Sequence, residues 1–141
     1  MRAVLDTNVV VSALLWNGPP YRLLQHATDG DLELFTSPTL AAELEEILGR
    51  RHLAKKLQEQ RTSARQLTAL YLELARTVSP LTLPRVVRDP DDDHVLACAV
   101  AATADLIVTG DQDLLVLKHH QDIPIVTVVD ALQRIAPAAS R

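Results

Sequence analysis

Two short apolar segments of this chain each end directly at an aspartate. Residues 3–5 are followed by Asp6, and residues 106–110 are followed by Asp111. Continuous apolar runs of this length are typical of buried parallel strands. Open α/β sheets bind their ligands at the carboxyl ends of the strands. Two carboxylates at that edge therefore indicate a metal site of the hydrolytic kind.

Both aspartates also have simpler interpretations. Asp6 is well suited to be the N-cap of a helix, because its side chain accepts hydrogen bonds from free amides. Gly110-Asp111 fits an ordinary turn from a strand into a helix, with Asp113 two residues further on. We predict that Asp111 is the nearer of these two carboxylates to the metal and that Asp113 is a second carboxylate nearby.

Glu43 borders the apolar stripe of a predicted helix. Ser37, followed by proline, is a strong N-cap signal for a helix that extends to about Leu48. Glu43 lies beside the apolar stripe of this helix, whereas Glu45 and Glu46 project away from it. A carboxylate next to the core must be paired, hydrogen-bonded or metal-bound unless it reaches sideways to water. Both alternatives stay open for Glu43.

A third group of acids precedes a helix that is apolar nearly all round. Four of residues 89–93 are aspartates. Some of them complement the helix dipole, and either Asp89 or Asp91 is expected to be the cap. Asp92 is compatible with either role. We predict that Asp93, which is nearest to the buried part of the helix, points inward.

All these acids are expected at one edge of the sheet. Carboxylates that lie so close repel one another unless a cation is bound between them. Oxygen ligands without a Cys or His cluster favour Mg²⁺ or Mn²⁺ over Zn²⁺. Carboxylate-bound Mg²⁺ is the usual apparatus of phosphoryl chemistry, in which it polarises the phosphate and generates hydroxide.

Short apolar strands alternate with longer helical stretches, which predicts βαβ units and a mostly parallel sheet. Strands are expected at residues 2–5, 32–36, 77–79, 106–108 and 125–129. Helices are expected at residues 8–15, 21–27, 38–48, 53–76 (one or two helices), 89 or 91 to 102, and in a short last helix that Asp130 caps. Residues 80–84 are expected to be an irregular link, and the tail to fray after Pro137.

Composition limits the class of protein. The 141 residues, 48% of them apolar, suffice for one domain over residues 1–141. The single cysteine, Cys98, lies in an apolar stretch and is expected to be a buried thiol in a reduced compartment. The longest apolar run, residues 95–102, falls short of the ~18 residues of a membrane span. No signal peptide precedes the first strand, so we expect a cytoplasmic protein without a membrane anchor.

Charge is unevenly distributed along the chain. The net charge of −4 is mildly unfavourable for a protein that binds nucleic acid. Residues 50–76, however, are predicted to form a helical arm. Within residues 50–65 of this arm only Glu59 opposes six basic residues, which are Arg50, Arg51, Lys55, Lys56, Arg61 and Arg65. The first four are candidate contacts to a nucleic-acid backbone. A solvated helical face, or a surface for an acidic partner, is an equally good interpretation.

Four segments match a known pattern in order and spacing: residues 4–9, 37–43, 89–97 and 108–114. Together they resemble a PIN domain over essentially the whole chain. The sequence is most similar to stand-alone PIN proteins of bacteria and archaea, of the kind of VapC-type toxins of toxin–antitoxin pairs. This resemblance implies a three-layer α/β/α fold with a parallel five-stranded sheet.

The resemblance also implies a metal-dependent ribonuclease that uses Mg²⁺ or Mn²⁺. The four acids of the family fall on Asp6, Glu43, Asp93 and Asp111, and Asp113 matches a further acid. The metal would be held by Asp6, Asp93, Asp111 and Asp113.

Two further positions match supporting residues of the family. Thr109 matches a hydroxyl residue beside the site, and Asn8 a residue that buttresses it. His94 departs from the family pattern, and either a surface role or a substrate contact fits it. Family likeness further suggests RNA as the substrate, a homodimer, and an antitoxin that inserts near the active site.

Three alternative functions are compatible with parts of the pattern. In a binding module, the same acids hold a metal weakly, no cleavage occurs, and RNA or a protein is the partner. A phosphatase of the haloacid dehalogenase type requires Asp-x-Asp after the first strand, but Asn8 occupies the second position. A response-regulator receiver requires a late lysine, and Lys118 is poorly placed for that role.

Overall fold

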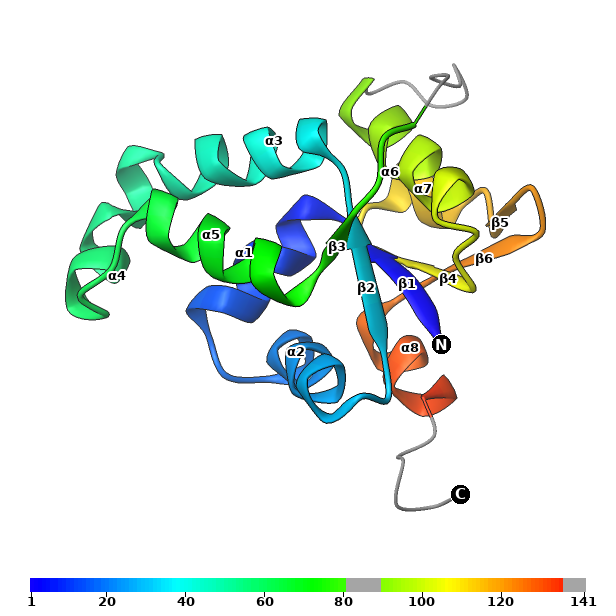
Figure 1. The fold of residues 1–141 in the computed structure, drawn as a ribbon, viewed down its shortest axis with the longest axis horizontal. Helices are drawn as coiled ribbons and strands as arrows, with labels where there is room; N and C mark the ends of the chain where they lie inside the picture. The colour runs from blue at the N-terminus through cyan, green and yellow to red at the C-terminus, as the bar shows by residue number, and fades with distance from the viewer. Residues whose placement is uncertain (81–89, 136–141) are drawn as a thin grey trace.

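A central sheet of six strands, in the order β3-β2-β1-β4-β6-β5, organises the described residues (Figure 1). The computed structural model describes residues 1–80 and 90–135, with only the backbone at 90–92. The strands are β1 (Arg2–Leu5), β2 (Glu33–Thr36), β3 (Arg76–Thr77), β4 (Leu106–Val108), β5 (His119–His120) and β6 (Ile123–Val126). All neighbours are parallel except β5 and β6. The α/β prediction is confirmed, but the predicted number of five strands is wrong.

Successive residues of the central strands point to opposite faces of the sheet, as the period of a strand requires. Ala3 and Leu5 join one apolar cluster, whereas Val4 between them joins another. The first cluster includes residues of α1 (Thr7–Leu15), α2 (Pro19–Asp29), α3 (Pro38–Leu48), α5 (Ala64–Leu74) and α8 (Val128–Arg134). The second includes residues of α6 (Pro90–Ala101) and α7 (Gln112–Leu115). The sheet is therefore the middle layer of three, as predicted.

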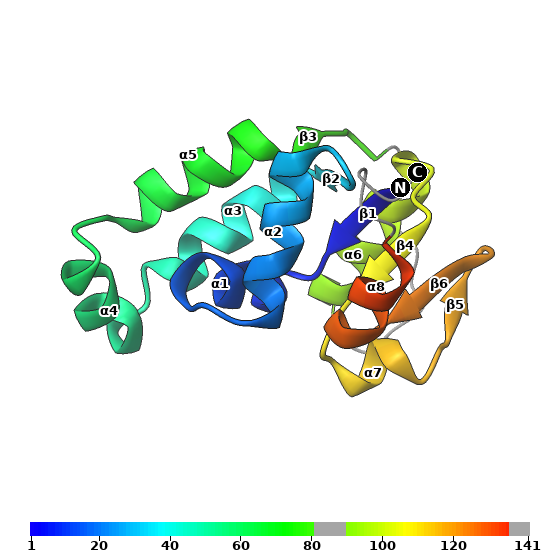
Figure 2. The same ribbon diagram turned by 90° about the horizontal axis from the view of Figure 1, so that it is seen from below.

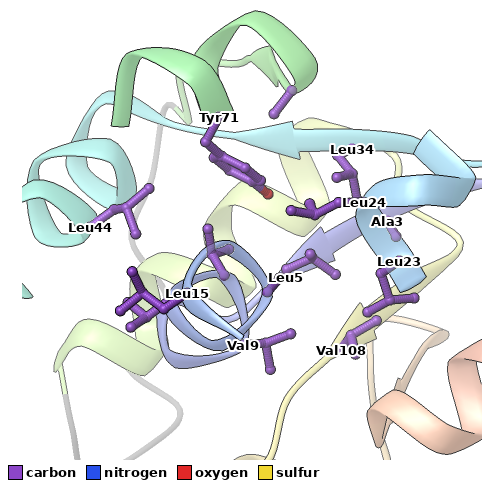
Figure 3. Packing of buried hydrophobic residues seen from close by; sticks show 14 of the residues in the cluster. Ala3, Leu5, Val9, Leu15, Leu23, Leu24, Leu34, Leu44, Tyr71 and Val108 are labelled. Atoms are coloured by element: carbon purple, nitrogen blue, oxygen red, sulfur yellow. The ribbon is translucent and has the colours of Figure 1, made fainter. Parts of the chain in front are cut away.

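Figure 3 shows the first cluster from close by. Leu5 and Val108 extend from adjacent strands towards Val9 of α1 and Leu23 of α2 (Figure 3). Leu5, Val108 and Leu23 are at most 3% exposed. Because β1 and α1 meet directly at Asp6, this packing fixes the direction in which the chain leaves the sheet edge.

The segment from residue 50 to 76 folds as two α-helices after a short 3₁₀ turn, η1 (Arg51–Leu53). The α-helices are α4 (Ala54–Glu59) and α5, whose N-cap Ser63 accepts a hydrogen bond from the Gln66 amide at 3.1 Å. Leu53, Leu57 and Leu67 of this segment are buried in the first cluster. The segment extends away from the sheet (Figure 2), and most of its basic residues are exposed.

The predicted capping of α3 is confirmed, because the Leu40 amide donates to Ser37 Oγ at 3.2 Å. The last strand differs from the prediction. The backbone of Gln121 and Asp122 has positive φ, which forms a tight hairpin between β5 and β6 and moves β6 towards the N-terminus. The short strand β5, His119–His120, carries no apolar alternation and was not predicted.

Thr127, not Asp130, is the N-cap of α8. The Asp130 amide donates to Thr127 Oγ1 at 3.2 Å, so the predicted role of Asp130 as the cap is wrong. Asp130 instead lies in the first turn, with its carboxylate 3.6 Å from the Arg134 guanidinium. The sequence Thr-x-x-Asp is a known capping pattern that could have revealed this arrangement.

The predictions for the cysteine and for membrane spans can also be compared with the structure. Cys98 is a free, fully buried thiol, and burial raises its pKa to about 12. Within residues 1–80 and 90–135, none of the helices combines the length and apolarity that crossing a bilayer requires. The cap at Asp89 or Asp91, the role of Asp92, the link at residues 81–84 and the fraying after Pro137 lie outside what the structure describes.

Replacing the cap of α8 tests its assignment. Thr127→Ala is expected to lower the free energy of unfolding by about 0.5–2 kcal/mol, because the first turn loses its acceptor. Asp130→Asn is expected to cost about 0.5 kcal/mol or less, because its carboxylate is exposed and pairs with Arg134 only at the surface. Urea denaturation of both variants measures the difference, and the reverse order of the two effects would refute the assignment.

Candidate active site

Asp6 lies at the carboxyl end of β1, where the strand passes into α1. Its amide donates to the Val108 carbonyl at 2.9 Å, which ties the end of β1 to the end of β4. The Thr109 hydroxyl donates to Asp6 Oδ2 at 2.7 Å. Asp6 occupies the N-cap position of α1, and its side chain makes no hydrogen bond of full capping geometry to the first turn. The Thr7 and Asn8 amides nevertheless lie near enough to its carboxylate to favour the ionised form, so the capping interpretation is met in part.

Thr109 connects three strand ends. It is fully buried, and its amide donates to the Val126 carbonyl at 3.0 Å. Its hydroxyl donates to Asp6 and also accepts a hydrogen bond from the Asp111 amide at 3.0 Å. Thr109 thus contacts both Asp6 and Asp111, and β1, β4 and β6 meet at this residue, while its supporting role in a functional site stays a prediction.

The side chain of Asp111 both caps a helix and lies beside Asp6. Its Oδ1 accepts a hydrogen bond from the Asp113 amide at 2.8 Å and so caps α7. The strand-to-helix turn interpretation is therefore correct for this oxygen. The side chain also lines the same cleft as Asp6, and its charge acts on Asp6.

Asp6 is held in an electrostatically unfavourable environment. Burial raises the pKa of its carboxyl group above the ordinary value, and the nearby charge of Asp111 raises it further. The hydrogen bond from Thr109 opposes this shift by stabilising the ionised form, and the backbone amides of Thr7 and Asn8 do so to a smaller extent. In the part of the chain that the structure describes, neither Asp6 nor Asp111 forms an ion pair with a basic side chain. The pair therefore lacks a compensating positive charge from these residues.

Asp6 and Asp111 line a cleft of about 540 Å³. Asn8 and Ser12 of α1 line it together with Thr127, so amide and hydroxyl groups accompany the carboxylates. Sequence reasoning included Asn8 but missed the other two. Ser12 lies one turn after Asn8 on the same helix face, and Thr127 follows β6 as Asp6 follows β1.

Asp93 and Glu43 lie on two helices that contact each other. Asp93 is 1% exposed in the first turn of α6, which agrees with its predicted inward direction. Glu43 is half-buried on α3, whereas Glu45 and Glu46 are exposed, as predicted. Figure 1 shows the starts of α3 and α6 close together, and the two helices are in contact.

Neither Asp93 nor Glu43 lines the cleft of Asp6 and Asp111. In the described ranges, no three or more His, Cys, Asp or Glu side chains form a ready-made metal site. The structure thus joins Asp6, Thr109 and Asp111 directly, and the metal-binding roles of Asp93 and Glu43 stay predictions.

The other residues singled out in the sequence lie at the margin of this network or beyond it. Asp113 contacts it only through its amide, because its side chain is exposed in the first turn of α7, and His94 is half-buried. The basic residues lie on η1, on its N-cap and on α4, and none of them lines the cleft. The Arg50 guanidinium is already paired with Glu46 at 3.0 Å. A role of this segment in RNA binding therefore concerns substrate at some distance from the carboxylates.

Removing the Thr109 hydroxyl tests the network. Thr109→Val is expected to raise the pKa of Asp6 further, because its ionised form loses a hydrogen bond. The variant is also expected to lose about 1–3 kcal/mol of stability, since the Asp111 amide loses its acceptor. Carbon-13 NMR titration of the Asp6 carboxyl measures the shift, and Thr109→Ser is the matched control. An unchanged pKa in Thr109→Val would show that the bond is not formed in solution.

Comparison with solved structures finds the same fold in another protein. A structure described as VapBC2 from Rickettsia felis, bound to a DNA fragment from their promoter, matches with a TM-score of 0.61. The match covers 90% of this chain and 98% of that chain at 14% sequence identity. At this identity the likeness concerns the fold alone. A search of curated proteins finds no match.

The family comparison is more direct. The model of the PIN domain matches residues 2–113. This range contains Asp6, Glu43, Asp93, Thr109 and Asp111, and it ends within the first turn of α7. Because it spans most of the 141 residues, the chain belongs to the PIN domain family, whose members are generally nucleases.

Proposed function

We propose that this protein is a metal-dependent endoribonuclease and the toxin of a VapC-type toxin–antitoxin pair. The observation that carries the proposal is the pairing of Asp6 with Asp111 through Thr109 at the carboxyl edge of the sheet. A buried carboxylate with a raised pKa beside a second carboxylate is unfavourable on its own. Such an arrangement is expected where a cation compensates the charge.

The donor set fits a hard divalent cation. Asp6 and Asp111 offer carboxylate oxygens, which Mg²⁺ and Mn²⁺ prefer. We propose that these two residues bind the metal, with Asp93 as a further ligand and Asp113 and Glu43 as supporting acids. When bound, Mg²⁺ or Mn²⁺ supplies charge stabilisation at the phosphate and a more acidic water.

The chain's own groups orient the reactants. The Thr109 hydroxyl fixes one oxygen of Asp6, so the other oxygen keeps a defined direction. Asn8, Ser12 and Thr127 supply hydrogen-bonding groups along the cleft. Groups of these types bind phosphate and sugar oxygens, including the ribose 2′-hydroxyl. The presence of these groups in the cleft supports RNA as the substrate. The products would carry 5′-phosphate and 3′-hydroxyl ends.

The basic segment is proposed to hold the RNA backbone. Arg51 and Lys55 are exposed, and neither forms an ion pair within the described residues. Lys56 is half-buried, with its ammonium group over the Trp16 ring. Arg50 is already paired with Glu46 and is expected to contribute less. A local cluster of positive charge offsets the net charge of −4 for a polyanionic substrate.

A protein partner is part of the proposal. The fold likeness to VapBC2 supports an antitoxin as that partner. A homodimer and a cytoplasmic location are proposed with it on family likeness. A PIN-fold module that binds RNA or protein without cutting is the alternative, and the following experiment separates the two.

RNA cleavage tests the site. Purified protein with Mg²⁺ or Mn²⁺ is expected to cut single-stranded RNA, and Asp6→Asn and Asp93→Asn to lower the rate at least about 100-fold. Asp122→Asn is the matched control. It makes the same change in an exposed turn at positive φ, which asparagine tolerates well. Gel analysis of a 5′-labelled oligonucleotide measures the rates.

The variants also exclude a contaminating nuclease. Cleavage that is equally fast in Asp6→Asn, Asp93→Asn and Asp122→Asn would not come from this site. Tight RNA binding without cleavage by any preparation would favour the binding-module alternative.

The raised pKa of Asp6 leads to a stability prediction. Because the folded state binds this proton more strongly than the unfolded state, stability falls as pH rises through the ordinary value of 3.8 and the folded pKa. Asp6→Asn cannot ionise, so in EDTA at pH 7 its Tm is expected to exceed that of the wild type. The difference should disappear below pH 3.8.

Added metal should offset the destabilisation that the ionised Asp6 causes in the wild type. Mg²⁺ or Mn²⁺ at 100 times its Kd is expected to stabilise the wild type by about 2.7 kcal/mol and Asp6→Asn much less. Thermal denaturation followed by circular dichroism measures both effects. Equal stabilisation of the two proteins would place the cation elsewhere.

A further inference from the structure

The four aromatic residues of this chain are divided sharply between core and surface. Phe35 and Tyr71 are buried, whereas Trp16 and Tyr21 are 47% and 39% exposed. Both exposed rings line one hollow beside the end of α1, together with Asn17, Lys56 and Gln60. The only tryptophan of the chain is therefore nearly half exposed, and a second aromatic ring lies with it in the same hollow.

Trp16 follows the same helix whose residues Asn8 and Ser12 line the active cleft. It is the C-cap of α1, and its amide donates to the Ser12 carbonyl at 3.0 Å, which fixes its backbone one turn beyond Ser12. At 1.5 Å per residue, Trp16 is about 15 Å along the helix from Asp6.

The cleft and the hollow are neighbours at the start of α2. Pro20 lines the cleft, and the next residue, Tyr21, lines the hollow. A single strand that leaves the carboxylates along α1 would therefore pass from one to the other within a few nucleotides.

The basic segment, residues 50–76, is attached to the body of the protein at the end of α1. Gln60 Nε2 donates to the Leu15 carbonyl at 2.8 Å, which ties the end of α4 to the end of α1 (Figure 2). Lys56 Nζ lies 5.5 Å from the centre of the Trp16 ring. A base that contacts the indole would thus have a positive charge within reach of its phosphate.

The chemistry of the hollow favours single-stranded RNA over a protein partner. Aromatic rings next to lysine and side-chain amides are the groups that bind unpaired bases and their phosphates. Tryptophan and tyrosine are enriched at protein interfaces, whereas lysine is depleted there, so it is the lysine beside the rings that favours a polyanion. The exposed Arg51 and Lys55 on η1 and α4 extend the same positive character.

We propose that Trp16 stacks on an unpaired base of the RNA about 15 Å from the cleavage site, with Lys56 at the adjoining phosphate. This inference rests on the proposed ribonuclease function and names its recognition of single strands. Trp16 is a positioning residue here, because it contacts the substrate away from the reacting phosphate.

Binding in EDTA tests the proposal without cleavage. Trp16 is the only tryptophan, so its fluorescence reports directly on stacking. Titration with a single-stranded RNA oligonucleotide is expected to quench it, and the same RNA in a duplex to quench it less. By fluorescence anisotropy of labelled RNA, Trp16→Ala is expected to weaken binding about 5- to 150-fold, as one lost base stack predicts.

Matched variants separate stacking from other roles. Trp16→Phe should retain most of the affinity, and Leu72→Ala, which truncates another exposed apolar side chain on α5, all of it. Lys56→Gln should lower the slope of log affinity against log salt by about 0.7. Circular dichroism confirms that each variant is folded.

Three results would overturn the proposal. These are the absence of quenching by RNA, equal affinity of Trp16→Ala and wild type, and a Trp16→Ala variant whose defect is loss of self-association by size-exclusion chromatography. These measurements need neither metal nor cleavage. Stacking on Trp16 can therefore be confirmed even if the protein does not cut RNA, and cleavage can be confirmed even if Trp16 does not bind RNA.

Discussion

The hydroxyl group of Thr109 is the contact on which the site depends. It donates to Asp6 at the end of β1 and accepts from the amide of Asp111 after β4. The amide of Thr109 at the same time bonds to Val126 at the end of β6. One fully buried side chain thereby sets the relative positions of two carboxylates that are 105 residues apart in sequence. The parallel order of β1, β4 and β6 makes this arrangement possible, because it brings three carboxyl ends to one edge.

This arrangement opposes the stability of the fold. Burial and a neighbouring charge raise the pKa of Asp6, so its ionisation at neutral pH destabilises the folded state. The apolar clusters on both faces of the sheet supply the stability that tolerates it. Strain of this kind at the ligand-binding edge of an α/β sheet is typical of functional sites. The same account explains why a bound cation would both stabilise the protein and enable its proposed chemistry.

The sequence predicted most of what local pattern decides. The apolar runs before Asp6 and Asp111, the Ser37 cap and the burial of Asp93 all follow from periodicity and capping rules. Prediction from the sequence failed where contacts between distant residues, or unusual backbone angles, determine the structure. The β5–β6 hairpin depends on positive φ at two non-glycine residues, and Thr127 became the cap of α8 because β6 ended earlier than its apolar run. The approach of α4 to the end of α1 depends on a hydrogen bond between residues 45 positions apart, which no local pattern reveals.

Asp6 and Asp111 are proposed to share a divalent cation in a nuclease cleft. Crystals of the protein soaked in Mn²⁺ would show whether they do, because the anomalous scattering of manganese locates the ion without reference to activity. We expect an anomalous peak within coordination distance, about 2.0–2.2 Å, of oxygens of both Asp6 and Asp111, and no such peak in Asp6→Asn. A Mn²⁺ ion bound elsewhere, or a peak that persists in the variant, would contradict the proposal.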